Sequence, residues 1–440
     1  MNGQPETDTP TRWFPPRPRS VEETGLKRDD LVEYILKTLY VRGTLTGAEL
    51  EDSLKLPYLG VLEEAMRFLR DEAFVEVRRG ITLVELHWEF FLTQKGMERA
   101  ESLMERQGYV GPAPVPYEKY LAYFETVSPP RGGIDRDRLK TALRDLVFPE
   151  SLFDQLGPAL NAGRPVFLYG PPGTGKTSIA ERIARVRGGD LWIPYALRVH
   201  GHIVRLFDPL HHDPLPLSEE ELSETVDLRW VRVRRPFIMV GGELTLKSLE
   251  LQYEQHSKTY VSPIHMKANG GILLVDDFGR QRVPPRDLLN RWIVPLEKER
   301  DFFTLQTGEQ ITVPFKMQLI FSTNLRPEDL VDEAFLRRIP YRVYVPAPTE
   351  ALFKEIFRRV CTHYGVPYDA AAVDRLIEKH YRSKQRPFRA SHPRDLVLQI
   401  LEHARFLGVP PSLSDDLMDR AAENYLGILD HFREGGPTLA

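Results

Sequence analysis

Cysteine, long apolar runs and excess charge of one sign are all scarce in this chain. Cys361 is the single cysteine among 440 residues, which excludes an internal disulfide and indicates a reducing compartment. No apolar run approaches the roughly 20 residues that span a bilayer, and no secretory signal opens the sequence, so we expect a cytoplasmic protein without membrane insertion. The net charge of −4, from 59 basic and 63 acidic side chains, predicts no general attraction to nucleic acid or anionic lipid.

The chain divides by composition and by apolar periodicity. Helical apolar stripes begin at Asp29, a hairpin pattern follows Phe74, and a helix pattern follows Thr93. From Ile134 onward strands alternate with helices, which indicates a parallel α/β sheet. We predict five parts: a disordered tail at 1–26, an α+β domain at 27–107, a Pro/Gly-rich linker at 108–133, an α/β domain at 134–346 with an insertion around 195–265, and a helical domain at 347–440.

The predicted N-terminal domain contains three helices, a two-stranded hairpin and a closing helix, in this order along the chain. A capping box runs from Thr46 to Glu49. This order resembles a winged helix-turn-helix domain. Residues 1–110 carry 15 basic and 20 acidic side chains. Phosphate neutralisation supplies most non-specific DNA affinity, so we favour docking to a protein over binding to DNA. Arg78 and Arg79 at the hairpin tip keep DNA binding as an alternative.

A phosphate-binding loop follows the apolar stretch Val166 to Tyr169. Its pattern, G-x-x-x-x-G-K-[ST], stands between a predicted strand and a predicted helix, which is the context that this loop requires. Backbone N–H groups converge on the phosphates, Lys176 reaches the β and γ oxygens, and the Thr177 hydroxyl takes a place on Mg²⁺. The predicted binding residues are Gly170, Pro171, Pro172, Gly173, Thr174, Gly175, Lys176, Thr177 and Ser178.

Two adjacent carboxylates, Asp276 and Asp277, end the apolar stretch Ile272 to Val275. Carboxylates at the end of a buried strand need a cation, hydrogen-bond donors or water, and a plain surface turn is the alternative interpretation. Loops at the carboxyl ends of neighbouring parallel strands lie together. We therefore predict that Asp276 orders the Mg²⁺ held by Thr177 through one of its waters, and that Asp277 faces the attacking water.

GPPGTGKT and GGILLVDD, with several later residues, together resemble the AAA+ ATPases over roughly residues 134–430. The resemblance implies a P-loop NTPase sheet with a C-terminal helical lid, ATP and Mg²⁺ as cofactors, ATP hydrolysis, and self-association into a ring, which we expect to be a hexamer. Ser-His-Pro-Arg is similar to MoxR-like members, whereas ANGGILLVDD is similar to bacterial enhancer-binding activators.

The resemblance also implies roles for three residues. Asn324, at the end of MQLIFSTN, would be sensor 1 and would hold the attacking water or the γ-phosphate. Arg338, in Leu-Arg-Arg-Ile, would be the arginine finger that acts on the neighbouring subunit, with Arg337 as the alternative. Arg394, in Ser-His-Pro-Arg, would be sensor 2 and would couple the lid to the nucleotide state.

The chain departs from the family at Asp277, where glutamate is usual. The shorter side chain withdraws the carboxylate by about 1.5 Å, and geometric errors of that size cost large rate factors. Two alternatives follow: hydrolysis is slow, or the loop lies closer to the phosphates and compensates for the shorter side chain.

The insertion around 195–265 contains four histidines that are candidates for a metal site and two tyrosines that are candidates for lining a pore. Its histidines lack the spacing of a structural zinc site and have no cysteine nearby, so we favour a loop over a metal site for His200, His202, His211 and His212. Tyr253 and Tyr260 would line the central pore of a ring or pack against the sheet.

These features predict an ATP-hydrolysing AAA+ protein that remodels a protein partner recruited through its N-terminal domain. An ATP-gated, DNA-binding transcription regulator is the second hypothesis. A slowly hydrolysing, nucleotide-gated scaffold is the third, and the short side chain of Asp277 motivates it.

Overall fold

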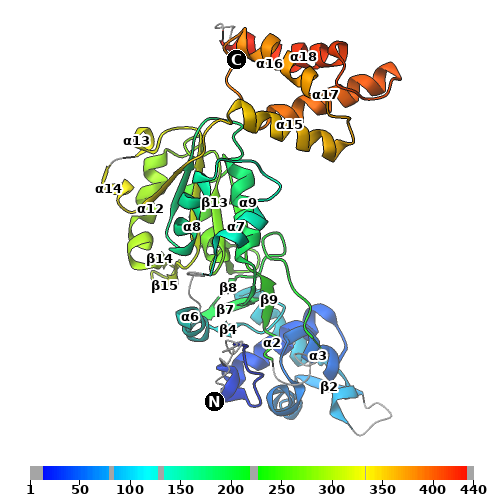
Figure 1. Ribbon diagram of the computed structural model, residues 1–440. Coiled ribbons are helices and arrows are strands. Elements are labelled where there is room, and N and C mark those ends of the chain that lie inside the picture. The colour runs from blue at the N-terminus through cyan, green and yellow to red at the C-terminus, as the bar shows by residue number, and fades with distance from the viewer. Residues whose placement is uncertain (1–12, 79–83, 127–132, 219–225, 332, 434–440) are drawn as a thin grey trace, which may run out of the picture.

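The computed structural model describes residues 13–78, 84–126, 133–218, 226–331 and 333–433. Figure 1 shows an elongated arrangement, with the N-terminal module at one end, the C-terminal helices at the other and the sheets between them. Within the described ranges, no helix is both long enough and apolar enough to cross a membrane.

The N-terminal module packs helices on a small antiparallel sheet in the order β1-β3-β2. The predicted capping box is present, because the N–H of Glu49 donates to Thr46 Oγ1 at 3.2 Å and the N–H of Thr46 donates to Glu49 Oε2 at 2.7 Å. Arg79 lies outside the described residues, and the winged-helix interpretation stays a prediction. The elements are α2 (Arg28–Arg42), β1 (Leu45–Thr46), α3 (Gly47–Leu54), α4 (Glu63–Asp71), β2 (Val75–Arg78), β3 (Glu89–Leu92) and α5 (Gln94–Arg106), with short helical turns at Tyr58–Leu62 and Glu85–His87.

The segment before this module is not a disordered tail over residues 13–26, so that prediction is wrong for these residues. It carries the short helix α1 (Val21–Thr24) and buries Val21 and Leu26 in the core of the module. Proline and arginine content favoured disorder, whereas the apolar residues that anchor the segment are few and widely spaced. Residues 1–12 lie outside the described part of the chain.

The predicted linker contains regular structure, so that prediction is wrong for residues 115–126. It forms β4 (Val115–Pro116) and α6 (Tyr117–Thr126). Tyr120, Tyr123 and Phe124 share one buried face of α6, as residues at i, i+3 and i+4 do. The prolines and glycines on both sides of this stretch favour a linker by composition.

The predicted insertion forms a second sheet in the order β11-β12-β8-β7-β4. Strand β4 joins it from the former linker and pairs in parallel with β7. A two-stranded antiparallel ribbon of β6 and β9 lies beside it in the same hydrophobic core. The strands are β6 (Asp190–Pro194), β7 (Ala196–Val199), β8 (His202–Arg205), β9 (Trp230–Arg234), β11 (Gln252–Glu254) and β12 (Thr259–Val261).

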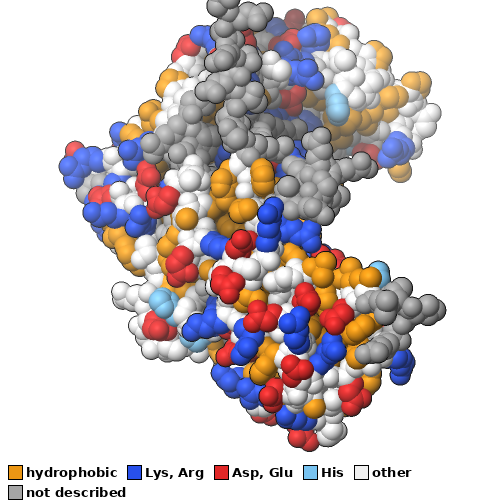
Figure 2. Space-filling model, turned by 90° about the horizontal axis from the view of Figure 1, so that it is seen from below, with side chains coloured by type: hydrophobic (Ala, Val, Ile, Leu, Met, Phe, Trp, Pro, Cys, Tyr) orange, Lys and Arg blue, Asp and Glu red, His pale blue; other side chains and the backbone are white. Residues whose placement is uncertain are grey.

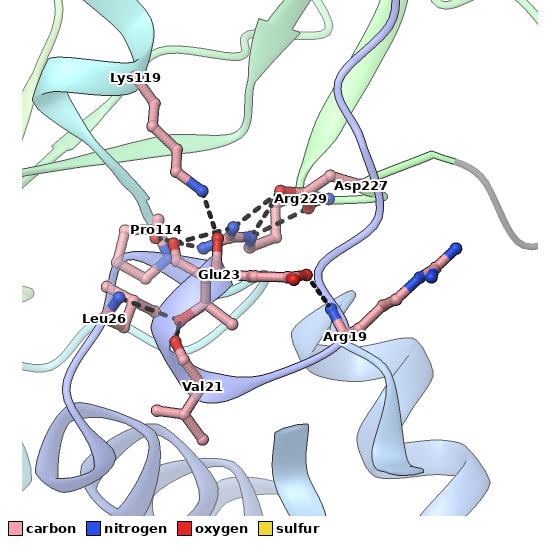
Figure 3. A network of polar contacts seen from close by, with 9 residues as sticks. Arg19, Val21, Glu23, Leu26, Pro114, Lys119, Asp227 and Arg229 are labelled. Atoms are coloured by element: carbon pink, nitrogen blue, oxygen red, sulfur yellow. Dashed lines mark hydrogen bonds and ion pairs between the residues drawn. The ribbon is translucent and has the colours of Figure 1, made fainter. Parts of the chain in front are cut away.

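A buried arginine at the start of β9 joins the N-terminal segment to the residue before β4 (Figure 3). Arg229, fully buried, donates through Nε and Nη2 to the carboxylate of Asp227, the shortest contact being 2.7 Å. The same guanidinium donates to the carbonyl oxygens of Thr24 at 3.1 Å and Pro114 at 3.3 Å. Three chain segments that are distant in sequence therefore meet at one satisfied buried cation.

The nucleotide-binding part is a five-stranded sheet in the order β10-β13-β16-β5-β17, in which every neighbouring pair is parallel. This confirms the predicted parallel α/β fold. Alternate residues of β5 and β13 face opposite cores, one shared with α7, α8 and α9 and the other with α12. The elements are α7 (Arg136–Ala142), α8 (Ser151–Asn161), β5 (Val166–Tyr169), α9 (Lys176–Arg187), β10 (Phe237–Val240), α11 (Ile264–Lys267), β13 (Ile272–Val275), α12 (Pro285–Lys298), β14 (Arg300–Thr304), β15 (Gln310–Pro314), β16 (Gln318–Thr323), α13 (Pro327–Leu330), α14 (Glu333–Leu336) and β17 (Tyr341–Tyr344), with a 3-10 turn at Leu246–Leu249.

The C-terminal part is helical and has its own apolar core. It contains α15 (Glu350–Tyr364), α16 (Ala370–Ile377), α17 (His392–Leu407) and α18 (Asp415–Arg433), with a π turn at Glu378–Arg382. Residues 434–440 lie outside the described part.

Candidate nucleotide-binding site

The loop between β5 and α9 is built on glycines that no other residue could replace without a shift of the backbone. Gly170 has φ +148°, and a Cβ there would lie 2.3 Å from the carbonyl oxygen of Val345. Gly173 and Gly175 have φ +72° and +93°, in the left-handed region that favours glycine. The loop therefore presents bare backbone in front of the first turn of α9, where a phosphate binds.

Lys176 opens α9 and turns back over this loop. Its Nζ donates to the carbonyl oxygens of Gly170 and Pro171, both at 2.9 Å, and to Oδ1 of Asn324 at 2.8 Å. Burial lowers the pKa of Lys176 to about 8, although the carboxylates of Asp276 and Asp277 oppose this shift. A buried cation with a lowered pKa is poised to gain stabilisation from an anionic ligand.

The first carboxylate after β13 meets the first hydroxyl of α9. Thr177 Oγ1 donates to Asp276 Oδ2 at 2.9 Å, and the N–H of Asp276 donates to the carbonyl oxygen of Val240 at 2.8 Å. Two oxygen ligands that Mg²⁺ prefers therefore lie together, in front of the phosphate loop.

The second carboxylate is held in a restricted backbone conformation. Asp277 has φ +47°, a region that aspartate and asparagine tolerate better than most residues because their short polar side chains form local hydrogen bonds. Its Oδ1 accepts a hydrogen bond from Nδ2 of Asn324 at 3.2 Å. Asn324 thus contacts both Lys176 and Asp277.

These residues border one cavity of about 1190 Å³ between the parallel sheet and the C-terminal helices. Its wall includes Lys176, Thr177, Ser178, Asp276, Asp277, Asn324 and Arg394 together with most of the phosphate loop. The structure therefore brings together the phosphate-loop, carboxylate, sensor 1 and sensor 2 candidates. Arg394 is exposed and pairs with the adjacent Asp395 at 3.0 Å.

A second lid residue, which the sequence analysis missed, contacts the phosphate loop directly. Arg389 Nη1 donates to the carbonyl oxygen of Pro172 at 3.1 Å, and the N–H of Ser391 donates to that of Gly173 at 3.1 Å. The lid segment 389–391 therefore rests on the top of the loop. No sequence signal marks Arg389, because the motif that points to the lid begins after it.

The two arginine-finger candidates lie away from this cavity. Arg338 is 26% exposed and forms an ion pair with Glu297 at 2.5 Å, whereas Arg337 is exposed. Neither residue borders the nucleotide cavity of its own chain.

Three of the insertion candidates, His212, Tyr253 and Tyr260, have structural partners. His212 is buried, and its Nδ1 accepts from the N–H of Asp208 at 2.9 Å while its Nε2 bonds the carbonyl oxygen of Lys267 at 2.9 Å. Tyr260 is buried, and its hydroxyl accepts from the N–H of Gln306 at 2.8 Å. Tyr260 therefore packs in the second sheet rather than facing a pore. Its ring lies 5.1 Å from that of the half-buried Tyr253.

The parallel sheet, the glycine-built loop and the paired lysine and carboxylates define a P-loop NTPase. Residues 165–339 match a family model described as AAA domain (dynein-related subfamily), and residues 349–424 match one described as Domain of unknown function (DUF8689). Residues 165–339 therefore form an AAA+ ATPase domain, which the motifs predicted. A vesicle-fusing ATPase from Dictyostelium discoideum is similar to this chain, with 41% identity over 61 residues, 13% of this chain and 8% of that protein.

Solved structures are similar at low identity. NtrX from Brucella abortus in complex with ATP shares 18% identity at a TM-score of 0.37, over 64% of this chain and 56% of that one. The Thermotoga maritima RuvB Holliday junction branch migration motor shares 16% identity at a TM-score of 0.38, over 68% of this chain and 82% of that one.

Proposed function

We propose that this chain is a cytoplasmic, Mg²⁺-dependent ATPase of the AAA+ type that remodels a protein partner. The observation that carries the proposal is that Lys176, Thr177 and Asp276 face one cavity, with Asp277 and Asn324 beside them. Three hydrogen bonds join these five residues. An arrangement fixed before the ligand arrives costs little to organise when it binds.

The residues present fit a nucleoside triphosphate with a divalent cation. The loop has no room for side chains at Gly170, which leaves backbone N–H groups to face phosphate oxygens. Lys176 supplies the buried cation, and Thr177 and Asp276 supply the oxygen ligands for Mg²⁺. When bound, the metal would offset negative charge on the phosphates.

The remaining residues supply positioning and proton transfer. Asp277 is the acceptor for the proton of the attacking water, and Asn324 orients the Asp277 carboxylate through its amide. The contacts of Arg389 and Ser391 with the phosphate loop hold the lid over the cavity and restrict the access of water.

Self-association into a ring, as a hexamer, is part of the proposal. Arg338 or Arg337 would act on the cavity of the neighbouring subunit, since neither borders the cavity of its own. The exposure of Arg337 supports testing both positions, because Arg338 would first have to leave Glu297. If the finger acts between subunits, turnover will be lost in the finger variant and restored by mixing it with a Lys176→Ala variant.

The N-terminal module would recruit the partner protein. On the face that Figure 2 shows, basic and acidic side chains are interspersed over the end of the molecule where this module lies, and the described residues form no continuous basic patch in this view. On α4, for example, Arg67 pairs with Glu63 at 3.2 Å. Such a surface neutralises few phosphates, which supports a protein partner over DNA. A steep fall in DNA affinity with salt would instead support the regulator hypothesis.

The test of the proposed activity is steady-state phosphate release by wild type, Asp277→Asn and Lys176→Ala. We expect Asp277→Asn to bind ATP as wild type does and to lose turnover, because asparagine keeps the φ +47° backbone and the polar shape but cannot accept the proton. Lys176→Ala should lose binding. Wild-type turnover that is negligible despite tight ATP binding would favour the nucleotide-gated scaffold.

A further inference from the structure

The segment Trp13 to Arg19, which we term the N-terminal strap, has the pattern of a polyproline II ligand. Pro15 and Pro18 are buried, whereas Pro16 and Arg19 are exposed. This spacing of three matches a polyproline II helix, which has three residues per turn and whose φ proline favours. The strap carries no helix. An isolated β-bridge between Pro16 and Val226 and a partly exposed ion pair of Arg17 with Glu51 at 3.0 Å join it to the rest of the described chain.

The surface under the strap, which we term the aromatic groove, is lined by Lys119, Ala122, Tyr123, Thr126, Asp227 and Trp230. The ring of Trp13 lies 4.3 Å from that of Tyr123 and 6.0 Å from that of Trp230. Tyr123 and Trp230 meet edge to face at 5.3 Å. The N–H of Asp227 donates to the carbonyl oxygen of Pro15 at 2.9 Å. Aromatic ridges with a donor for a proline carbonyl are the chemistry that recognises polyproline II segments.

The two ends of this N-terminal region are held very differently. After the strap, the carbonyl oxygen of Thr24 accepts a hydrogen bond from the fully buried Arg229. Figure 3 shows the same guanidinium beside Asp227 and Pro114. At the strap itself, Trp13 and Phe14 are 42% and 46% exposed, and a cavity of about 810 Å³ remains between strap and groove. The strap can therefore leave the groove without breaking the Arg229 junction.

We propose that the aromatic groove is a recognition site for proline-rich segments, occupied in cis by the strap and open to a partner's proline-rich segment in trans. The trans ligand has the chemistry of the strap: an aromatic residue, prolines three residues apart and flanking arginine. Tethering gives the strap a local concentration of the order of millimolar, so it excludes weak ligands and yields to a stronger or multivalent one. This site is separate from the nucleotide cavity and does not depend on ATP hydrolysis.

The test measures binding of a fluorescent peptide, WFPPRPRS, to the full chain by anisotropy. The acceptors are wild type and the triple variant Trp13→Ala/Pro15→Ala/Pro18→Ala, whose groove lacks its cis ligand. We expect the triple variant to bind the peptide at least tenfold more tightly than wild type. A control peptide with alanine in place of the first and third prolines should bind neither. Equal affinity for the two peptides, or no saturable binding to the folded triple variant, would overturn the proposal.

Two further variants keep the test decisive. Ala122→Arg, at an exposed position that lines the cavity, should abolish peptide binding when added to the triple variant, because it fills the groove and repels the basic peptide. If circular dichroism shows that the triple variant does not fold, Trp13→Ala replaces it, since Trp13 is partly exposed and the buried Pro15 and Pro18 are then kept. Peptide affinity in Trp13→Ala that equals the wild-type value then rejects the proposal.

Discussion

The ammonium group of Lys176 donates a hydrogen bond to Oδ1 of Asn324 at 2.8 Å, across 148 residues of sequence. The amide nitrogen of Asn324 in turn donates to Asp277 at 3.2 Å. Because both ends of the asparagine are engaged, its orientation is determined by the protein. The residue that follows β16 thus links the lysine that we propose to bind phosphate to the carboxylate that we propose to accept the proton of the attacking water.

Replacement of Asn324 by leucine keeps the side-chain volume and removes both hydrogen bonds. We expect turnover to fall by about 100-fold, as when one preorganised donor is lost from an active site, while ATP affinity changes much less. Phosphate release and nucleotide binding measure the two effects separately. Asn290→Leu, at an exposed position on α12, is the matched control and should change neither. An unaltered turnover in Asn324→Leu would show that the link is structural.

ATP binding should take up protons near pH 8. Burial lowers the pKa of Lys176 to about 8 in the free chain, so about half of the molecules lack this proton at pH 8, and an anionic ligand restores it. Calorimetry at pH 8 in two buffers of different ionisation enthalpy should show an uptake of about half a proton, falling toward zero at pH 6.5. Lys176→Arg should show none at either pH, because arginine stays protonated. Equal uptake at both pH values would contradict the assignment.

The lowered pKa of Lys176 also determines the direction in which the stability of the ligand-free chain changes with pH. The pKa of Lys176 is lower in the folded state than its ordinary value of 10.5, so between about pH 8 and 10.5 the unfolded chain binds more protons than the folded chain. The contribution of Lys176 therefore makes the free energy of unfolding rise with pH across this window. Denaturant titrations at several pH values give the free energy of unfolding of wild type and of Lys176→Met. We expect the wild-type value minus the Lys176→Met value to rise between about pH 8 and 10.5. A difference that falls with pH would refute the prediction.

Asp277→Glu tests whether the short carboxylate limits turnover. Glutamate reaches about 1.5 Å further but tolerates the left-handed backbone at φ +47° less well than aspartate. We expect turnover to rise several-fold and stability to fall by about 1 kcal/mol. Phosphate release and thermal denaturation would measure these effects. A fall in both quantities would mean that the local backbone already places the aspartate correctly.

The sequence predicted those parts of the site that depend on local motifs. The phosphate loop, Asp276, Asp277 and Asn324 follow buried strands, and the parallel sheet brings the ends of those strands together. Arg389 could not be predicted, because its contact with Pro172 spans 217 residues and depends on how the lid sits on the sheet. The strap was missed for a related reason. Its prolines suggest disorder by composition, whereas its Trp13 ring contacts Tyr123 and Trp230, which are distant in the sequence.

Gly173→Ala should disrupt the contact between the phosphate loop and the lid. The residue has φ +72°, and a Cβ would lie 2.7 Å from Ser391 Oγ. We expect ATP affinity to fall more than tenfold, because both the loop backbone and the lid must shift. Gly157→Ala is the matched control: Gly157 lies inside α8 and a Cβ there meets nothing within 4 Å. It should raise stability by about 0.5–1 kcal/mol and leave ATP affinity unchanged.

The buried pair of Arg229 and Asp227 should be among the most sensitive positions for stability. Arg229→Met leaves the Asp227 carboxylate buried without its cation and the carbonyl oxygens of Thr24 and Pro114 without their donor. We expect a loss of about 3–5 kcal/mol, as when one partner of a buried ion pair is removed.

The double variant Arg229→Met/Asp227→Leu should lose less stability than Arg229→Met alone, because no unpaired charge then stays buried. Arg234→Met, which breaks an exposed pair with Asp213 in which both side chains are 67% exposed, should cost no more than about 1 kcal/mol. Urea denaturation of the three variants decides the point, and a cost for Arg229→Met as small as that for Arg234→Met would mean that the junction does not hold the N-terminal segment in place.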